Sequence, residues 1–131
     1  MSRTDNEAVV RRIFDAFAQK QGFGLRDIFA PDAVWIVPGD GTMAGVYRGR
    51  EAIFRFLGRL PKETDGTYGS RLVDVLASDD RAAALYRASG ERQGRRLDLD
   101  QVLLFRMRDG VVHEVLALPS DPAAFEEFWG A

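Results

Sequence analysis

Residues 102–115 read VLLFRMRDGVVHEV, and this stretch decides the fold. Residues of one apolar face recur at every second position on both sides of Asp109-Gly110. An Asp-Gly pair between two such runs is a strong signal for a two-residue β-hairpin turn. Working back along the chain, the same alternation recurs twice, with polar turn residues between the runs. The second half of the chain is therefore expected to form antiparallel strands, over residues 71–77, 81–92, 95–108 and 111–118.

The first half of the chain has a helical period instead. Apolar residues fall on one stripe between residues 5 and 20, and Thr4 and Glu7 have the spacing of a capping box, which predicts a helix there. A second amphipathic helix is expected over residues 50–60, closed by Pro61. Shorter elements are expected as a helix over 25–29, strands over 33–37 and 46–47, and a C-terminal helix over 123–129. Helices followed by strands indicate an α+β fold.

The composition limits the number of domains and the function classes. A chain of 131 residues with 46% apolar residues has the size and core of one domain, which we place at residues 1–131. A net charge of −2 excludes a basic nucleic-acid binder. No cysteine and a single histidine exclude thiolate sites and multi-histidine metal sites, so we expect no metal. No apolar run reaches the length of a membrane span, and we expect a cytoplasmic protein without a membrane partner.

Four segments together resemble a SnoaL-like protein of the nuclear transport factor 2-like, or ketosteroid isomerase-like, superfamily. They are FAPDAVWIVPG (29–39), GVYRGREAIFRFLGRL (45–60), VLLFRMRDGVVHEV (102–115) and DPAAFEEFW (121–129). The resemblance covers about residues 7–129. It implies a cone-shaped, strongly curved antiparallel sheet wrapped around the N-terminal helices, the cystatin-like α+β roll. It also implies a pocket between sheet and helices, a homodimer formed through the outer sheet face, and no cofactor.

The catalytic sets of two enzymes with a similar layout are absent. The positions that match the acid–base groups of ketosteroid isomerase are Val37, Leu103 and either Ile13 or Phe14. The positions that match the Asp-Arg-Asp set of limonene epoxide hydrolase are Ala84, Tyr86 and Ala117. None of these residues is a carboxylate or an arginine, so neither reaction is expected by its usual mechanism. The fold supports many functions, and only the residues of the site can separate them.

The same comparison sets which side of each strand faces the pocket, and alternation then gives the inward residues. Most of them are apolar, and alanines stand where bulky residues would fill space, which is typical of a small-molecule pocket. The candidate ligand-binding residues are Phe14, Phe17, Trp35, Val37, Phe56, Tyr86, Gln101, Leu103, Phe105 and His113.

Tyr86, Gln101 and His113 are the polar members of this set. Tyr86 and His113 are the candidate catalytic residues: a tyrosine hydroxyl can donate to a ligand oxygen, and a histidine titrates near neutral pH. Gln101 interrupts an apolar run, and a buried amide needs partners, which could be Tyr86, His113 or a ligand. The structural alternatives are a core tyrosine with a satisfied hydroxyl and a half-exposed histidine at a hairpin end.

Several charged residues are expected to have ordinary structural roles. Asp98 and Asp100 are placed on the outer face, paired with arginines such as Arg87 and Arg96, unless a bulge shifts the register near residues 98–101. The arginines at 92, 95 and 96 are interpreted as a solvated turn, and Asp40 and Tyr47 are placed at the mouth of the pocket.

Two functions remain open from the sequence. The first is a protein that binds, and in one version transforms, a small hydrophobic molecule of polyketide-, terpenoid- or steroid-like character. The alternative is a non-catalytic dimeric accessory or protein-interaction module.

Overall fold

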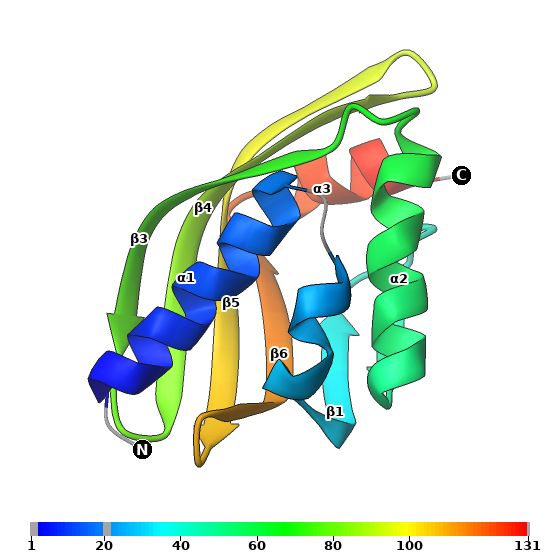
Figure 1. The fold of residues 1–131 in the computed structure, drawn as a ribbon. Coiled ribbons are helices and arrows are strands. Elements are labelled where there is room, and N and C mark those ends of the chain that lie inside the picture. Colours follow the sequence, from blue (N-terminus) through cyan, green and yellow to red (C-terminus); the bar gives the residue numbers. More distant parts are fainter. Residues whose placement is uncertain (1–2, 20–21, 131) are drawn as a thin grey trace.

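The computed structural model describes residues 3–19 and 22–130, which form three α-helices, a 3-10 helix and six strands (Figure 1). In chain order these are α1 (Arg3–Gln19), η1 (Gly22–Ile28), β1 (Phe29–Val37), β2 (Gly45–Arg48), α2 (Arg50–Glu63), β3 (Gly69–Ala77), β4 (Arg81–Arg92), β5 (Arg95–Arg108), β6 (Val111–Pro119) and α3 (Pro122–Trp129).

The strands form one curved, unclosed sheet in the order β2-β1-β6-β5-β4-β3. Every neighbouring pair is antiparallel except β1 and β6, which are parallel. Figure 1 shows α1 and α2 on one side of this sheet, while the long β4–β5 hairpin bends over toward α3. The α+β class and the curved sheet predicted from the sequence are confirmed. None of the helices in the described ranges is long and apolar enough to cross a membrane.

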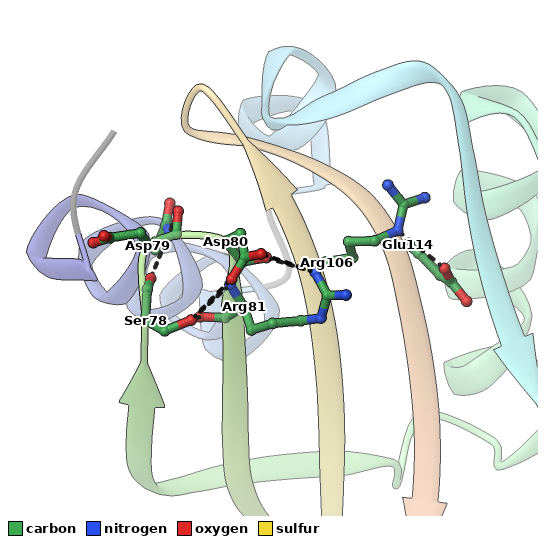
Figure 2. A network of polar contacts seen from close by, with 7 residues as sticks. Ser78, Asp79, Asp80, Arg81, Arg106 and Glu114 are labelled. Atoms are coloured by element: carbon green, nitrogen blue, oxygen red, sulfur yellow. Dashed lines mark hydrogen bonds and ion pairs between the residues drawn. The ribbon is translucent and has the colours of Figure 1, made fainter.

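Helix α1 lies across the concave face of β3 and β4, and a side chain near its N-terminal end bonds it to the β3–β4 turn. Asn6 is buried, and its Nδ2 donates to the backbone carbonyls of Ser78 and Asp79 at 2.9 Å each. Figure 2 shows the β3–β4 turn that carries these two carbonyls. The helix begins at Arg3, so Thr4 lies inside it and the predicted capping box is wrong. Residue 20, the predicted end, lies outside the described residues.

Helix α2 runs past the proline that was expected to end it. Pro61 lies inside the helix, which continues to Glu63. A proline removes one backbone donor, but the last turn is bonded in other ways. The Thr64 hydroxyl donates to the carbonyl of Leu60 at 2.7 Å, and the Gly66 N–H donates to the carbonyl of Pro61 at 2.7 Å. The predicted boundary is therefore three residues short.

Helix α3 is held at both ends. At its start, the side chain of Asp121 accepts a hydrogen bond from the backbone N–H of Ala124 at 3.1 Å, an N-cap. At its end, Arg92 donates to the carbonyls of Phe128 and Gly130 at 3.1 and 2.8 Å. Arg92 is only 6% exposed, so its assignment to a solvated turn is wrong. The cation lies where the helix dipole is negative, which favours it there.

A β-bulge in β6 changes the direction of one predicted site residue. Arg106 pairs with Glu114, but Met107 pairs with Val112, so His113 is the extra residue of the bulge. Val112 is completely buried, whereas His113 is half-buried. The expectation that His113 faces the pocket is wrong, because the extra residue interrupts the alternation between the two faces.

The outer face of the sheet carries the ion pairs expected from the sequence. Arg87 contacts Asp98 at 2.8 Å and Asp100 at 3.0 Å. The hydrogen bond from Arg87 lowers the pKa of Asp98. In the β3–β4 turn region, Arg106 on β5 pairs with Glu114 on β6 at 3.2 Å (Figure 2). The register around residues 98–101 is regular, so the predicted outward placement of the two aspartates is confirmed.

Candidate functional site

A cavity of about 610 Å³ lies between the concave face of the sheet and the helices. Its walls are mostly apolar and include nine aromatic side chains, eight of them from five helices and strands and the ninth, Tyr68, from the segment before β3. Eight of the predicted ligand-binding residues line it: Phe14, Phe17, Trp35, Val37, Phe56, Tyr86, Gln101 and Leu103. Most of the predicted residues therefore lie on the same wall, because alternation and helical period determine which face each side chain occupies.

Two predicted ligand-binding residues do not belong to the wall. Phe105 is completely buried on β5 but packs in the core, outside the residues that line the cavity. His113 lies in the bulge described above and is likewise outside this set. Asp40 and Tyr47, expected at the mouth, are also outside it, and the Tyr47 hydroxyl donates to the carbonyl of Met43 at 2.7 Å.

The exposed side chains among the lining residues of η1 and α2 place the mouth of the cavity between these two elements. Arg26 on η1 and Glu51 on α2 form an ion pair at 2.8 Å, and both side chains are more than half exposed. Along α2, Glu51, Phe54 and Gly58 follow at helical spacing and all line the cavity. Arg26 and Glu51 are the two charged residues among the described lining residues. Charge is therefore confined to the rim, and the interior wall is neutral.

The interior has one polar end, where β3, β4 and β5 lie side by side. Tyr86 and Gln101 are opposite each other on β4 and β5, and the Gln101 Nε2 donates to the Tyr86 hydroxyl at 2.8 Å. Tyr68, immediately before β3, and Ser70, the second residue of β3, also line the cavity, and Tyr68 contacts both Ser70 and Tyr86. Gln101 is 5% exposed, and its Oε1 has no hydrogen-bond partner among the described residues.

Burial determines the protonation of the two tyrosines. Desolvation raises the pKa of Tyr86 well above 10, and its contact with the Tyr68 hydroxyl raises it further. Desolvation also raises the pKa of Tyr68, against smaller lowering effects of Ser70 and Tyr86. Both hydroxyls are therefore neutral hydrogen-bond donors at physiological pH and not bases.

The polar groups of the interior do not form an acid–base pair. Glu51 is the one carboxylate among the described lining residues, and it stands at the rim, paired with Arg26. In the described part of the chain no group of three or more His, Asp or Glu side chains could hold a metal ion. The arrangement can donate hydrogen bonds to a ligand, accept one through Gln101, and surround an apolar body.

Sequence reasoning missed Tyr68, Ser70 and the contribution of α3. Tyr68 fell in a segment interpreted as a loop, and β3 begins two residues earlier than expected, at Gly69. Trp129 of α3 was not among the predicted ligand-binding residues, but it lines the cavity. A lone aromatic residue in the polar stretch TDGTYGS (64–70) was the available signal for Tyr68.

The arrangement of the sheet and helices is shared with solved structures of nuclear transport factor 2-like proteins. Residues 10–115 match the SnoaL-like domain family. The chain belongs to the SnoaL-like family, as the sequence resemblance predicted.

Similar proteins support this membership without adding an activity. An uncharacterised protein of Mycobacterium tuberculosis strain H37Rv is 38% identical over 122 residues, which is 92% of this chain and 93% of the relative. Bal32a, from a soil-derived mobile gene cassette, is 38% identical with a TM-score of 0.92 over 97% of this chain and 98% of its own. TerC, co-crystallised with polyporic acid, is 23% identical with a TM-score of 0.81 over 95% and 97%. At that identity the likeness shows the fold alone.

Proposed function

We propose that the protein binds a small, largely apolar molecule in the cavity between the sheet and the helices. The single observation that carries the proposal is the combination of a 610 Å³ space, aromatic walls and one group of polar side chains in its interior. Apolar cavities of this size with a few convergent polar groups are typical of ligand sites. Polyketide-, terpenoid- and steroid-like molecules have the right size and apolar character. TerC, which shares the fold, has been co-crystallised with polyporic acid.

The side chains of the cavity favour ligand binding without general acid–base catalysis. The raised pKa values of Tyr68 and Tyr86 keep both protonated at neutral pH, and His113 lies in the bulge of β6, outside the residues that line the cavity. Proton abstraction needs a base with a pKa near the working pH, within hydrogen-bond reach of the ligand. The interior wall offers donors and one acceptor, which suit recognition and the polarisation of a ligand oxygen.

Intrinsic fluorescence provides a direct test, because both tryptophans of the chain, Trp35 and Trp129, line the cavity. Titration with apolar ring compounds of the three classes should give a saturable change in tryptophan emission. A ligand at about 100 times its Kd should also stabilise the fold by about 2.7 kcal/mol, measured as a rise in Tm. Absence of both effects for every class would contradict the proposal.

A pair of variants on α2 separates binding in the cavity from surface association. In Gly58→Phe a large ring stands at the mouth, where an added Cβ meets no heavy atom within 4 Å. In Arg55→Phe the same ring is placed on the exposed face of the same helix, away from the cavity. Binding should be lost in the first variant and retained in the second. Equal loss in both would place the ligand elsewhere.

We also propose that two copies associate through the outer face of the sheet. One row of cross-strand neighbours is apolar across all six strands: Leu76, Ala83, Leu104, Leu116, Ile36 and Val46. Leu76 is 60% exposed and Leu104 is 40% exposed. Ion-paired residues, such as Arg106 and Glu114, flank the row. Exposed apolar patches with polar rims are typical of interaction surfaces, and a self-complementary row suits a two-fold pair.

Sedimentation equilibrium tests this association. The wild-type chain should be a dimer, and Leu104→Lys should shift it to a monomer. Ser89→Lys, on the same outer face but outside the row, serves as the control and should remain dimeric. A monomeric wild-type chain would exclude the proposed pairing.

A further inference from the structure

We infer that the polar end of the cavity selects a neutral ligand that carries a hydroxyl group, such as a phenol or another hydroxylated ring compound. The inference rests on the proposed binding function and adds the chemistry of the group that binds at this end. It depends on a count of donors and acceptors at Gln101, Tyr86, Tyr68 and Ser70, all of which line the cavity.

Gln101 supplies an acceptor that the protein itself leaves unused. Its Nε2 donates to the Tyr86 hydroxyl at 2.8 Å, while its Oε1 has no donor among the described residues. The side chain is 95% removed from solvent. A buried acceptor without a partner costs free energy, and a group that can donate to it recovers that cost. The ligand group at this position must therefore carry an O–H or N–H.

The neighbouring tyrosine hydroxyl adds a second requirement, that the ligand group also accepts a hydrogen bond. Tyr86 accepts from Gln101, so its own proton points elsewhere, toward Tyr68 or toward a ligand oxygen. A ligand hydroxyl can donate to the Gln101 Oε1 and accept from Tyr86 at the same time. A ketone or an ether can only accept, and it would leave the Gln101 oxygen unsatisfied. A hydroxyl is the smallest group that fills both roles.

Charged ligand groups are disfavoured at this end. Among the described lining residues, Arg26 is the one cation and Glu51 the one anion, and both stand at the mouth and pair with each other. A carboxylate or an ammonium group brought to the tyrosine end would lose its hydration without gaining an opposite charge, which is costly. The aromatic rings Phe14 and Tyr86, with centroids 5.2 Å apart, would instead contact the face or edge of a neutral ring.

Three probes that differ in one substituent test the selection: a naphthol, its methyl ether and naphthalene. Isothermal titration calorimetry of the full chain should give about a tenfold tighter Kd for the naphthol than for the ether, the effect of one or two net hydrogen bonds in a buried site. In Gln101→Met, which retains the volume but removes the acceptor, the naphthol should lose about tenfold while the ether changes little. Met107→Leu, buried on the same strand outside the cavity, is the control and should retain the preference.

The outcomes separate this inference from the proposed function. If all three probes bind with equal Kd, the cavity takes apolar molecules but the hydroxyl selection is refuted. If the preference persists in Gln101→Met, the selecting group is not Gln101 and the inference is overturned. If none of the three binds to the wild-type chain, the proposed function fails together with it. The comparison of the three probes on the wild-type chain needs no variant, so it remains decisive if a substitution prevents folding.

Discussion

Replacing Arg92 with methionine tests how the fold holds the helix that closes one end of the cavity. The guanidinium donates to the carbonyls of Phe128 and Gly130 at 3.1 and 2.8 Å and to the Thr42 hydroxyl at 3.2 Å. It also lies 6.0 Å from the centre of the Trp129 ring. Methionine retains the buried apolar stem and removes all of these polar contacts.

The magnitude follows from what replaces each lost contact. Hydrogen bonds to a charged group are worth about 1.5–3 kcal/mol each, so three give an upper limit of roughly 4.5–9 kcal/mol. Two effects reduce this sum. The charge no longer has to be buried, and its Nε has no acceptor among the described residues. The two carbonyls also retain Arg95, whose Nη1 donates to Gly130 at 2.8 Å and to Phe128 at 3.3 Å. We therefore expect a net loss of about 2–3 kcal/mol, or about 7–11 °C in Tm for a chain of this length.

A double-mutant cycle in urea measures this coupling. Arg92→Met and Arg95→Met should each leave the carbonyls of Phe128 and Gly130 with one donor, whereas the double variant leaves them with neither. The double variant should therefore lose about 1–2 kcal/mol more than the sum of the single losses. Strict additivity, or a loss below about 1 kcal/mol for Arg92→Met, would refute the view that the two arginines share the end of α3.

Three further predictions concern stability. Asn6→Ala should cost about 2 kcal/mol, since it removes both hydrogen bonds to the β3–β4 turn. Asn6→Asp should cost more, because a carboxylate would face two backbone carbonyls. Urea midpoints that rank the two variants in the opposite order would contradict this explanation. Gly58→Ala should stabilise by about 0.5–1 kcal/mol, because an exposed glycine inside a helix carries excess unfolded-state entropy and its added Cβ has open space; a lower Tm would exclude this explanation. Tyr86 has a pKa raised above its unfolded value of about 10, so the unfolded state ionises first, stability is complete below about pH 10 and falls as pH rises above it. Tyr86→Phe should make the alkaline decline in unfolding free energy shallower. An unchanged slope of unfolding free energy against pH would contradict this role of Tyr86.

Most of the fold could be predicted because its signals are local. The strands β4 and β5 occupy the predicted residues 81–92 and 95–108 without a shift, since a period of two and the turns at Gln93-Gly94 and Asp109-Gly110 act between near neighbours. Helix ends were less well predicted. Helix α1 begins two residues before the expected start, at Arg3, and α2 extends to Glu63 because the Thr64 hydroxyl and the Gly66 N–H bond its last turn, which periodicity does not indicate.

The site shows where local information ends. The sequence, together with the family resemblance of its segments, predicted the apolar wall, the inward direction of Tyr86 and Gln101, and the absence of the usual catalytic carboxylates. Only the tertiary structure decided that His113 leaves the cavity, because one inserted residue reverses the faces of a strand and the pairing partner decides where that insertion falls. It also decided that Arg92 is buried and that Tyr68 joins Tyr86, because both depend on residues far away in the chain. Periodicity specifies the face on which a side chain lies, and packing between distant elements specifies which atoms that side chain finds there.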